Sequence, residues 1–125
     1  MGNEIKHIKN GNVCSPKGFK SGSVFAGIKS PGQDKRDIGI IFSETECVSA
    51  GTFTQNSVVS PSVTWTKQAL KDNKLRAVIV NSGCANCAVG QQGFIDAKET
   101  AEITSKSLSI DINSVAVDST GIIGV

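Results

Sequence analysis

Short apolar runs separated by polar turns predict the strands of this chain. Asp37–Ser43 is a short apolar run that predicts a buried strand, Leu75–Val80 is the best strand candidate of the chain, and Ser114–Asp118 predicts another buried strand near the end of the sequence. Cys47–Gln55 is rich in β-branched residues and alternates polar with apolar positions, which predicts a strand antiparallel to residues 37–43. These segments indicate a sheet of several short strands.

The clearest helix begins near Phe94. Apolar or small residues recur there at spacings of three and four, and charged residues fall mostly on the other side; the face comprises Phe94, Ala97, Ala101, Thr104 and Leu108. A shorter helix is predicted over Ser62–Lys71 after Pro61, with Trp65, Ala69 and Leu70 on one face. The strand, helix and strand at about 75–118 predict a βαβ unit with parallel strands, so the fold class is α/β or α+β.

Residues 1–30 are rich in Gly, Lys and Ser. We expect a hairpin-like pair formed by Gly11–Phe19 and Val24–Ile28. Ser30–Arg36 is predicted to be a turn, since it contains a Pro-Gly pair and several charges.

Composition restricts the class of protein. A chain of 125 residues with 38% hydrophobic content fits one domain spanning 1–125. Thirteen Lys and Arg against eleven Asp and Glu give a net charge of +2, which argues against nucleic acid or a membrane surface as partner. No stretch approaches the roughly 18 apolar residues of a membrane helix, and the N-terminus lacks a secretory signal pattern. We therefore expect a cytoplasmic protein.

Two loops rich in small residues are the best candidates for chemistry. Asn81–Gly93 and Ser119–Gly124 follow two predicted parallel strands, so both should lie at one edge of the sheet, where ligands of such sheets bind. Thr120 and Gly121 offer a hydroxyl and an unobstructed backbone N–H, a combination that can bind an oxyanion. The alternative is that Thr-Gly only forms a turn. Neither loop matches a phosphate-binding loop.

The four cysteines raise a second possibility. Cys84 and Cys87 form a C-x-x-C pair that could bind metal or act in redox chemistry. A zinc site would need further ligands from Cys14, Cys47 or His7, which are scattered. Simple packing in a tight loop is the alternative, and we expect no metal and no cofactor. His7, the single histidine, is too far away to predict a nucleophile–histidine pair.

The same loops carry a family resemblance. Asn81-Ser-Gly-Cys-Ala-Asn-Cys-Ala-Val-Gly90, Gly93-Phe-Ile-Asp-Ala97 and Asp118-Ser-Thr-Gly-Ile-Ile-Gly124 resemble the ornithine acetyltransferase (glutamate N-acetyltransferase) family of arginine biosynthesis. Upstream segments follow the family's order; they are Gly18-Phe19, Ala26-Gly-Ile-Lys29, Asp37-Ile-Gly-Ile-Ile41, Ala50-Gly-Thr-Phe-Thr-Gln-Asn56 and Ser60-Pro-Ser-Val63. Cys84 departs from the family, which usually has Asn there.

The resemblance implies a specific reaction and fold. Such enzymes move an acetyl group from N-acetylornithine to glutamate, and some members also accept acetyl-CoA. The precursor cleaves itself before a threonine, whose hydroxyl then forms an acetyl-enzyme, and a Thr-Gly pair holds the oxyanion. That pair carries over to Thr120 and Gly121. The family has an αββα sandwich related to that of self-processing aminopeptidases, which are the nearest enzymatic alternative, and it assembles as an α2β2 heterotetramer of the two cleavage products.

The resemblance also implies that this sequence is the N-terminal part of an α chain. The family's processing junction, nucleophilic threonine and remaining substrate pocket have no counterpart in it, so the chain alone should be inactive. We further expect poor stability in isolation, because its final strand would lack partners. The competing interpretations are a non-catalytic subunit and a small thiol or metal-binding module that uses Cys84 and Cys87.

Overall fold

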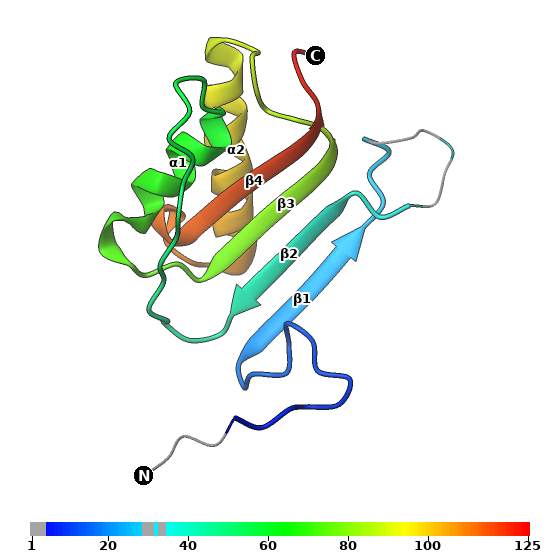
Figure 1. The fold of residues 1–125 in the computed structure, drawn as a ribbon, viewed down its shortest axis with the longest axis vertical. Coiled ribbons are helices and arrows are strands. Elements are labelled where there is room, and N and C mark those ends of the chain that lie inside the picture. The colour runs from blue at the N-terminus through cyan, green and yellow to red at the C-terminus, as the bar shows by residue number, and fades with distance from the viewer. Residues whose placement is uncertain (1–4, 29–31, 33–34) are drawn as a thin grey trace.

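The computed structural model describes residues 5–28, 32 and 35–125 (Figure 1). Four strands, two α-helices and two short 3-10 helices follow one another along this part of the chain. Their order is β1 (Phe19–Val24), β2 (Ile38–Ser43), α1 (Pro61–Ala69), η1 (Leu70–Asp72), β3 (Ala77–Cys84), α2 (Gln91–Leu108), η2 (Ile112–Ser114) and β4 (Val115–Ile122). No helix in the described ranges is long and apolar enough to cross a membrane.

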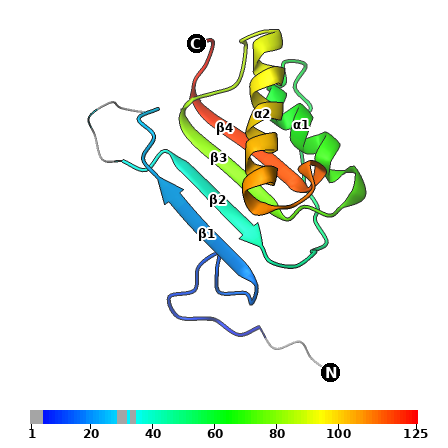
Figure 2. The same cartoon turned by 180° about the vertical axis from the view of Figure 1, so that it is seen from behind.

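The four strands form one sheet in the order β1-β2-β3-β4. The first two pairs are antiparallel, and β3 pairs with β4 in parallel, as Figures 1 and 2 show. The helix α2 connects these parallel strands. The predicted βαβ unit and the mixed α and β class are therefore confirmed. The second sheet of the expected sandwich has no counterpart in the described residues, and the sandwich stays a prediction.

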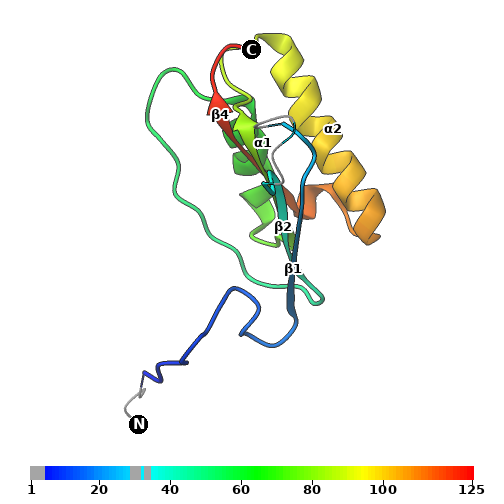
Figure 3. The same cartoon turned by 90° about the vertical axis from the view of Figure 1, so that its right-hand side faces the viewer.

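Helix α2 covers one face of the sheet. Figure 3 views the sheet nearly edge-on, with α2 along one side and the segment between β2 and α1 looping out on the other. The buried centre between α2 and the parallel strands is made of small apolar side chains, Ala77, Ala101, Val115 and Val117. Small side chains let helix and strands approach closely at high packing density. Ala97, Ala101 and Thr104 of the predicted face are buried, whereas Phe94 is exposed.

Helix α1 covers the outer edge of β4. Its start is set by Ser60, whose hydroxyl caps the helix by accepting from the Val63 N–H, and by Pro61 in the first turn. Trp65 Nε1 donates to the Val115 carbonyl (2.9 Å). Thr66 Oγ1 donates to the Val117 carbonyl (2.8 Å) and accepts from the Val117 N–H (3.0 Å). The expectation that the last strand lacks partners is therefore wrong, because β4 pairs with β3 over Val115–Ile122 and α1 also bonds to its other edge as far as Val117.

Two strand predictions are wrong. The hairpin of residues 11–19 and 24–28 does not form, because the strand lies between those segments, at Phe19–Val24, and pairs with β2. Cys47–Gln55 is irregular, because β1 and β3 already occupy both edges of β2. Single hydrogen bonds hold this segment instead; Cys47 Sγ, for example, donates to the Leu75 carbonyl (3.0 Å). Of the predicted turn Ser30–Arg36, residues 30, 31, 33 and 34 lie outside the described residues.

The parallel strands are longer than predicted. Both continue to Cys84 and Ile122, so the loops expected at Asn81–Gly93 and Ser119–Gly124 begin inside the strands. Asn, Ser and Gly are poor strand formers, which is why the pattern predicts a loop there. Pairing overrides this local preference, since the two strand ends stay in register with each other. Helix α2 likewise begins at Gln91.

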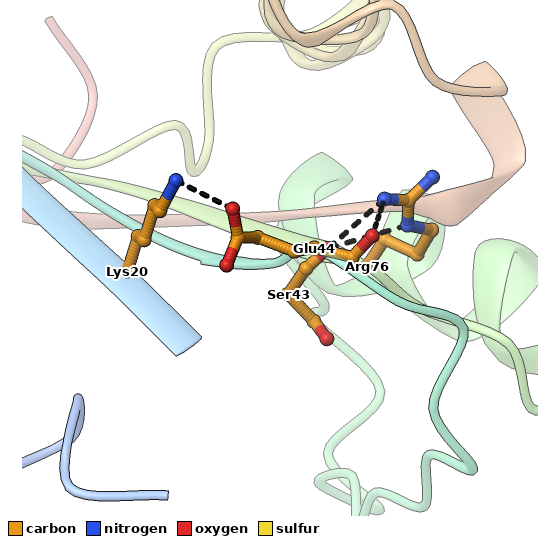
Figure 4. Close-up of polar contacts among 4 residues, drawn as sticks. All are labelled: Lys20, Ser43, Glu44 and Arg76. Atoms are coloured by element: carbon orange, nitrogen blue, oxygen red, sulfur yellow. Dashed lines mark hydrogen bonds and ion pairs between the residues drawn. The ribbon is translucent and has the colours of Figure 1, made fainter. Parts of the chain in front are cut away.

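Arg76 directly precedes β3, and its side chain bonds to the turn that follows β2 (Figure 4). Its guanidinium donates to the Ser43 carbonyl (3.1 and 3.3 Å) and to the Glu44 carbonyl (2.7 Å). It also lies 5.3 Å from the centre of the Phe42 ring. The neighbouring Lys20–Glu44 ion pair is largely exposed and contributes little.

Replacement of Arg76 by methionine is expected to lower the free energy of unfolding by about 2 kcal/mol, because three charge-assisted hydrogen bonds are lost. Arg76→Lys should lose less, since an ammonium keeps the charge but cannot reproduce the planar fork of donors. Urea denaturation of the three proteins checks this. A methionine variant as stable as the wild type would show that the carbonyls are equally well solvated by water.

Candidate active site

The ends of β3 and β4 lie side by side, as expected for the two candidate segments. In the parallel register Ser82 faces Thr120, Gly83 faces Gly121 and Cys84 faces Ile122. Both strand ends run toward the C-terminal end of the chain in Figure 1. The β3–α2 loop and the Thr120–Gly121 pair therefore share one edge of the sheet, the position at which α/β proteins bind ligands.

Gly121 occupies a position that only glycine fits. Its φ is +138°, and the facing Gly83 has φ +139°. A Cβ built on Gly121 would lie 2.2 Å from the Gly83 carbonyl carbon and 2.6 Å from the Cys84 nitrogen. The two backbones thus touch without intervening side chains, and both strands take a conformation that L-residues rarely adopt.

The open edge of β4 presents the donors of the Thr-Gly pair. Strand residues direct their backbone groups to alternate edges, and Val115 and Val117 direct theirs to α1. Alternation places the N–H of Gly121 on this same edge, beyond the last residue that α1 covers. Thr120 is exposed, and its side chain lies on the face opposite α2. A hydroxyl and a backbone N–H are therefore both accessible at the end of β4.

Behind this edge, a hydrogen-bonded network ties the β3–α2 loop to β4. Ser119 Oγ accepts from the Asn86 N–H (3.0 Å) and donates to the Cys84 carbonyl (3.0 Å). The same carbonyl accepts from Asn81 Nδ2 (2.8 Å), and the Asn86 side-chain amide donates to the Gly93 carbonyl (2.6 Å). Sequence patterns do not identify this network, although an Asn or Ser at a strand end is a recognised signal for backbone bonding.

A cavity of 360 Å³ lies between this network and the N-terminal half of α2. Ser119, Asn86, Asn81 and Ser62 contribute to its lining. Ser62 Oγ and Asn86 Oδ1 are buried and have no hydrogen-bond partner among the described residues. Such oxygens are the usual partners of buried water. The cavity is on the α2 side of the sheet, so Thr120 faces away from it.

The cysteines do not come together as a metal site in the described part of the chain. All four are free thiols, and Cys84 Sγ donates to the Val125 carbonyl (3.5 Å). No three His, Cys, Asp or Glu side chains in residues 5–28, 32 and 35–125 are grouped closely enough to hold a metal ion. His7 is exposed and lies in the segment that precedes β1.

Comparison with known proteins identifies relatives of nearly the whole chain. Residues 20–125 match the model of the ArgJ family. The arginine biosynthesis bifunctional protein ArgJ of Dehalococcoides mccartyi is 39% identical over 124 residues, which is 99% of this chain and 31% of that protein. The protein of the same name from Thermotoga neapolitana is 46% identical over 112 residues, 88% of this chain and 28% of its own. The chain thus spans about three tenths of the length of these curated relatives.

Two solved structures share the fold. The arginine biosynthesis bifunctional protein ArgJ from Bacillus halodurans superposes with a TM-score of 0.87 at 35% identity, covering 92% of this chain and 59% of that one. Ornithine acetyltransferase from Mycobacterium tuberculosis, solved in complex with ornithine, gives a TM-score of 0.83 at 41% identity. It covers 90% of this chain and 61% of that one. The arrangement of strands and helices described above is therefore that of these proteins.

Proposed function

The chain belongs to the ArgJ family, and from that premise we propose that it supplies part of the active site of a cytoplasmic acetyltransferase of arginine biosynthesis. The reaction moves the acetyl group of N-acetylornithine to glutamate, with acetyl-CoA as a further possible donor and no resident cofactor. The observation that carries the proposal is the match over residues 20–125, which includes both strand ends and the Thr120–Gly121 pair.

Thr120 and Gly121 are proposed to bind the oxyanion of the tetrahedral intermediate. Attack on the acetyl carbonyl places negative charge on its oxygen, and donors already fixed in position stabilise that charge without reorganising. The Thr120 hydroxyl and the Gly121 N–H are two such donors at an accessible edge. Their support is the exposure of Thr120 and the alternation along β4, which places the Gly121 N–H on the same edge as the backbone groups of Val117.

The nucleophile is proposed to come from a β chain produced by self-cleavage of the same precursor. The hydroxyl of its N-terminal threonine attacks the acetyl carbonyl, and its own amine accepts the hydroxyl proton. Collapse of the intermediate breaks the C–N bond and passes that proton to the departing ornithine amine. The amine of glutamate then attacks the acetyl ester, which releases N-acetylglutamate and restores the threonine. Two α and two β chains would form the assembly.

Acetyl transfer by the protein expressed from its complete gene tests this function. With N-acetylornithine labelled in its acetyl group, we expect labelled N-acetylglutamate and free ornithine in equal amounts. Omission of glutamate should leave a protein heavier by one acetyl group, located by mass spectrometry on a threonine. A folded protein that transfers no label from either N-acetylornithine or acetyl-CoA would refute the proposal.

A further inference from the structure

Ser119 lies directly before Thr120 but faces the other side of the sheet. It is half-buried and lines the 360 Å³ cavity beneath α2, whereas Thr120 is exposed on the opposite face. Successive side chains of a strand alternate between faces, so Ser119 cannot reach a substrate carbonyl that Thr120 binds. Any contribution of Ser119 to acetyl transfer must act through the position of its neighbours.

The Ser119 hydroxyl uses both its donor and its acceptor capacity on backbone groups of another segment. It accepts from the Asn86 N–H and donates to the Cys84 carbonyl, each at 3.0 Å. These groups belong to the end of β3 and to the loop that leads into α2. One hydroxyl therefore fixes the end of β4 against the start of the βαβ connection.

This part of β4 has few other side-chain ties. Helix α1 holds the outer edge of the strand only as far as Val117, through Thr66. At Gly121 and Gly83 the facing backbones carry no side chains that could interlock. The next bond between the segments comes after Thr120 and Gly121, where the Ala85 N–H donates to the Ile122 carbonyl (2.8 Å). Ser119 is thus the side-chain anchor immediately before Thr120 and Gly121.

We infer that Ser119 is a positioning residue, which holds the Thr120 hydroxyl and the Gly121 N–H where the oxyanion forms. This inference rests on the proposed function. Small displacements of groups that act in the transition state are costly, and a shift of about 1 Å can lower a rate on the order of 10²-fold. Since Ser119 does not contact substrate, its loss should change turnover much more than substrate binding.

The test compares Ser119→Ala with Ser119→Thr in the protein expressed from its complete gene. We expect Ser119→Ala to lower kcat for acetyl transfer by about 10- to 100-fold, with KM for N-acetylornithine within about twofold of the wild type. Ser119→Thr should restore most of kcat, because it keeps the hydroxyl and its added methyl group can enter the cavity that Ser119 lines.

Ser49 provides a matched control. It is also half-buried, and its hydroxyl likewise bridges two backbone groups, accepting from the Leu75 N–H (3.0 Å) and donating to the Leu75 carbonyl (3.4 Å). Leu75 precedes β3, at the end of the sheet opposite Thr120. Ser49→Ala should therefore affect stability as Ser119→Ala does while leaving kcat unchanged. Amide hydrogen exchange at Thr120 and Gly121 should be faster in Ser119→Ala alone.

The possible outcomes separate this inference from the proposed function. If the wild type transfers acetyl groups and Ser119→Ala keeps its kcat, the positioning role is refuted while the proposed function stands. The role is also refuted if Ser119→Thr is as slow as Ser119→Ala, or if Ser49→Ala slows transfer equally. A wild type that transfers no acetyl group refutes both proposals together.

Discussion

Replacement of Thr120 by valine is expected to lower kcat for acetyl transfer on the order of 10²- to 10³-fold, which is the usual effect of removing one oxyanion donor. Valine keeps the size and branching of threonine but lacks the hydroxyl. Because the side chain is exposed and makes no hydrogen bond within the described structure, the fold should tolerate the change. The measurement is steady-state transfer from N-acetylornithine to glutamate by the protein expressed from its complete gene.

Two further variants show whether the loss comes from the hydroxyl. Thr120→Ser keeps the donor and should retain most of the activity. Thr45→Val makes the same chemical change at an exposed threonine in the turn after β2, at the other end of the sheet, and should be neutral. KM for N-acetylornithine should change little in Thr120→Val, since the donor acts mainly on charge that develops in the transition state. A Thr120→Val enzyme with wild-type kcat would exclude Thr120 from the oxyanion site.

The sequence predicts best those elements whose hydrophobic pattern agrees with their final packing. Helix α2 is found because Ala97, Ala101 and Thr104 repeat at helical spacing and are the residues that pack on the sheet. The β3 and β4 segments are found because their apolar cores, around Val78 and Ala116, are continuous. In these places local preference and tertiary contacts favour the same structure.

The errors occur where a distant partner decides the local structure. The segment 47–55 has a strand-like composition, but the strand that it is expected to join, β2, has no free edge, because β1 and β3 occupy both of its edges. The ends of β3 and β4 show the opposite case, since their composition is typical of loops and yet they are paired strands in which Gly83 lies against Gly121. Local composition carries no information on which edges are free, so neither result follows from it.

The candidate site also has a part that the sequence predicts and a part that it does not. Glycine-rich strand ends and the parallel βαβ topology are sufficient to predict that Thr120 and the β3–α2 loop share one edge. The hydrogen bonds of Ser119 are not predictable in this way, because they depend on a register between residues more than thirty positions apart. Side chains that position a site through backbone hydrogen bonds, as Ser119 does, are therefore found only from the structure.

Replacement of Gly121 by alanine should lower the free energy of unfolding by about 3 kcal/mol or more. The added Cβ would lie 2.2 Å from the Gly83 carbonyl carbon and 2.3 Å from its oxygen, and both are backbone atoms that no rotamer change can move aside. The φ of +138° adds strain for any L-residue. The two strand ends must therefore separate, which would also disable acetyl transfer.

Gly124→Ala is the control for this prediction. Gly124 also has a positive φ, +83°, but a Cβ there would meet no atom within 4 Å. Its replacement should cost no more than about 1–2 kcal/mol, the price of the conformation alone. Urea denaturation of both variants measures the difference, and equal losses would show that close packing against Gly83 is not what requires glycine.

Because Gly121→Ala disturbs the strand as a whole, its loss of activity cannot by itself identify an oxyanion donor. The chemical assignment depends on Thr120→Val, in which the backbone stays intact.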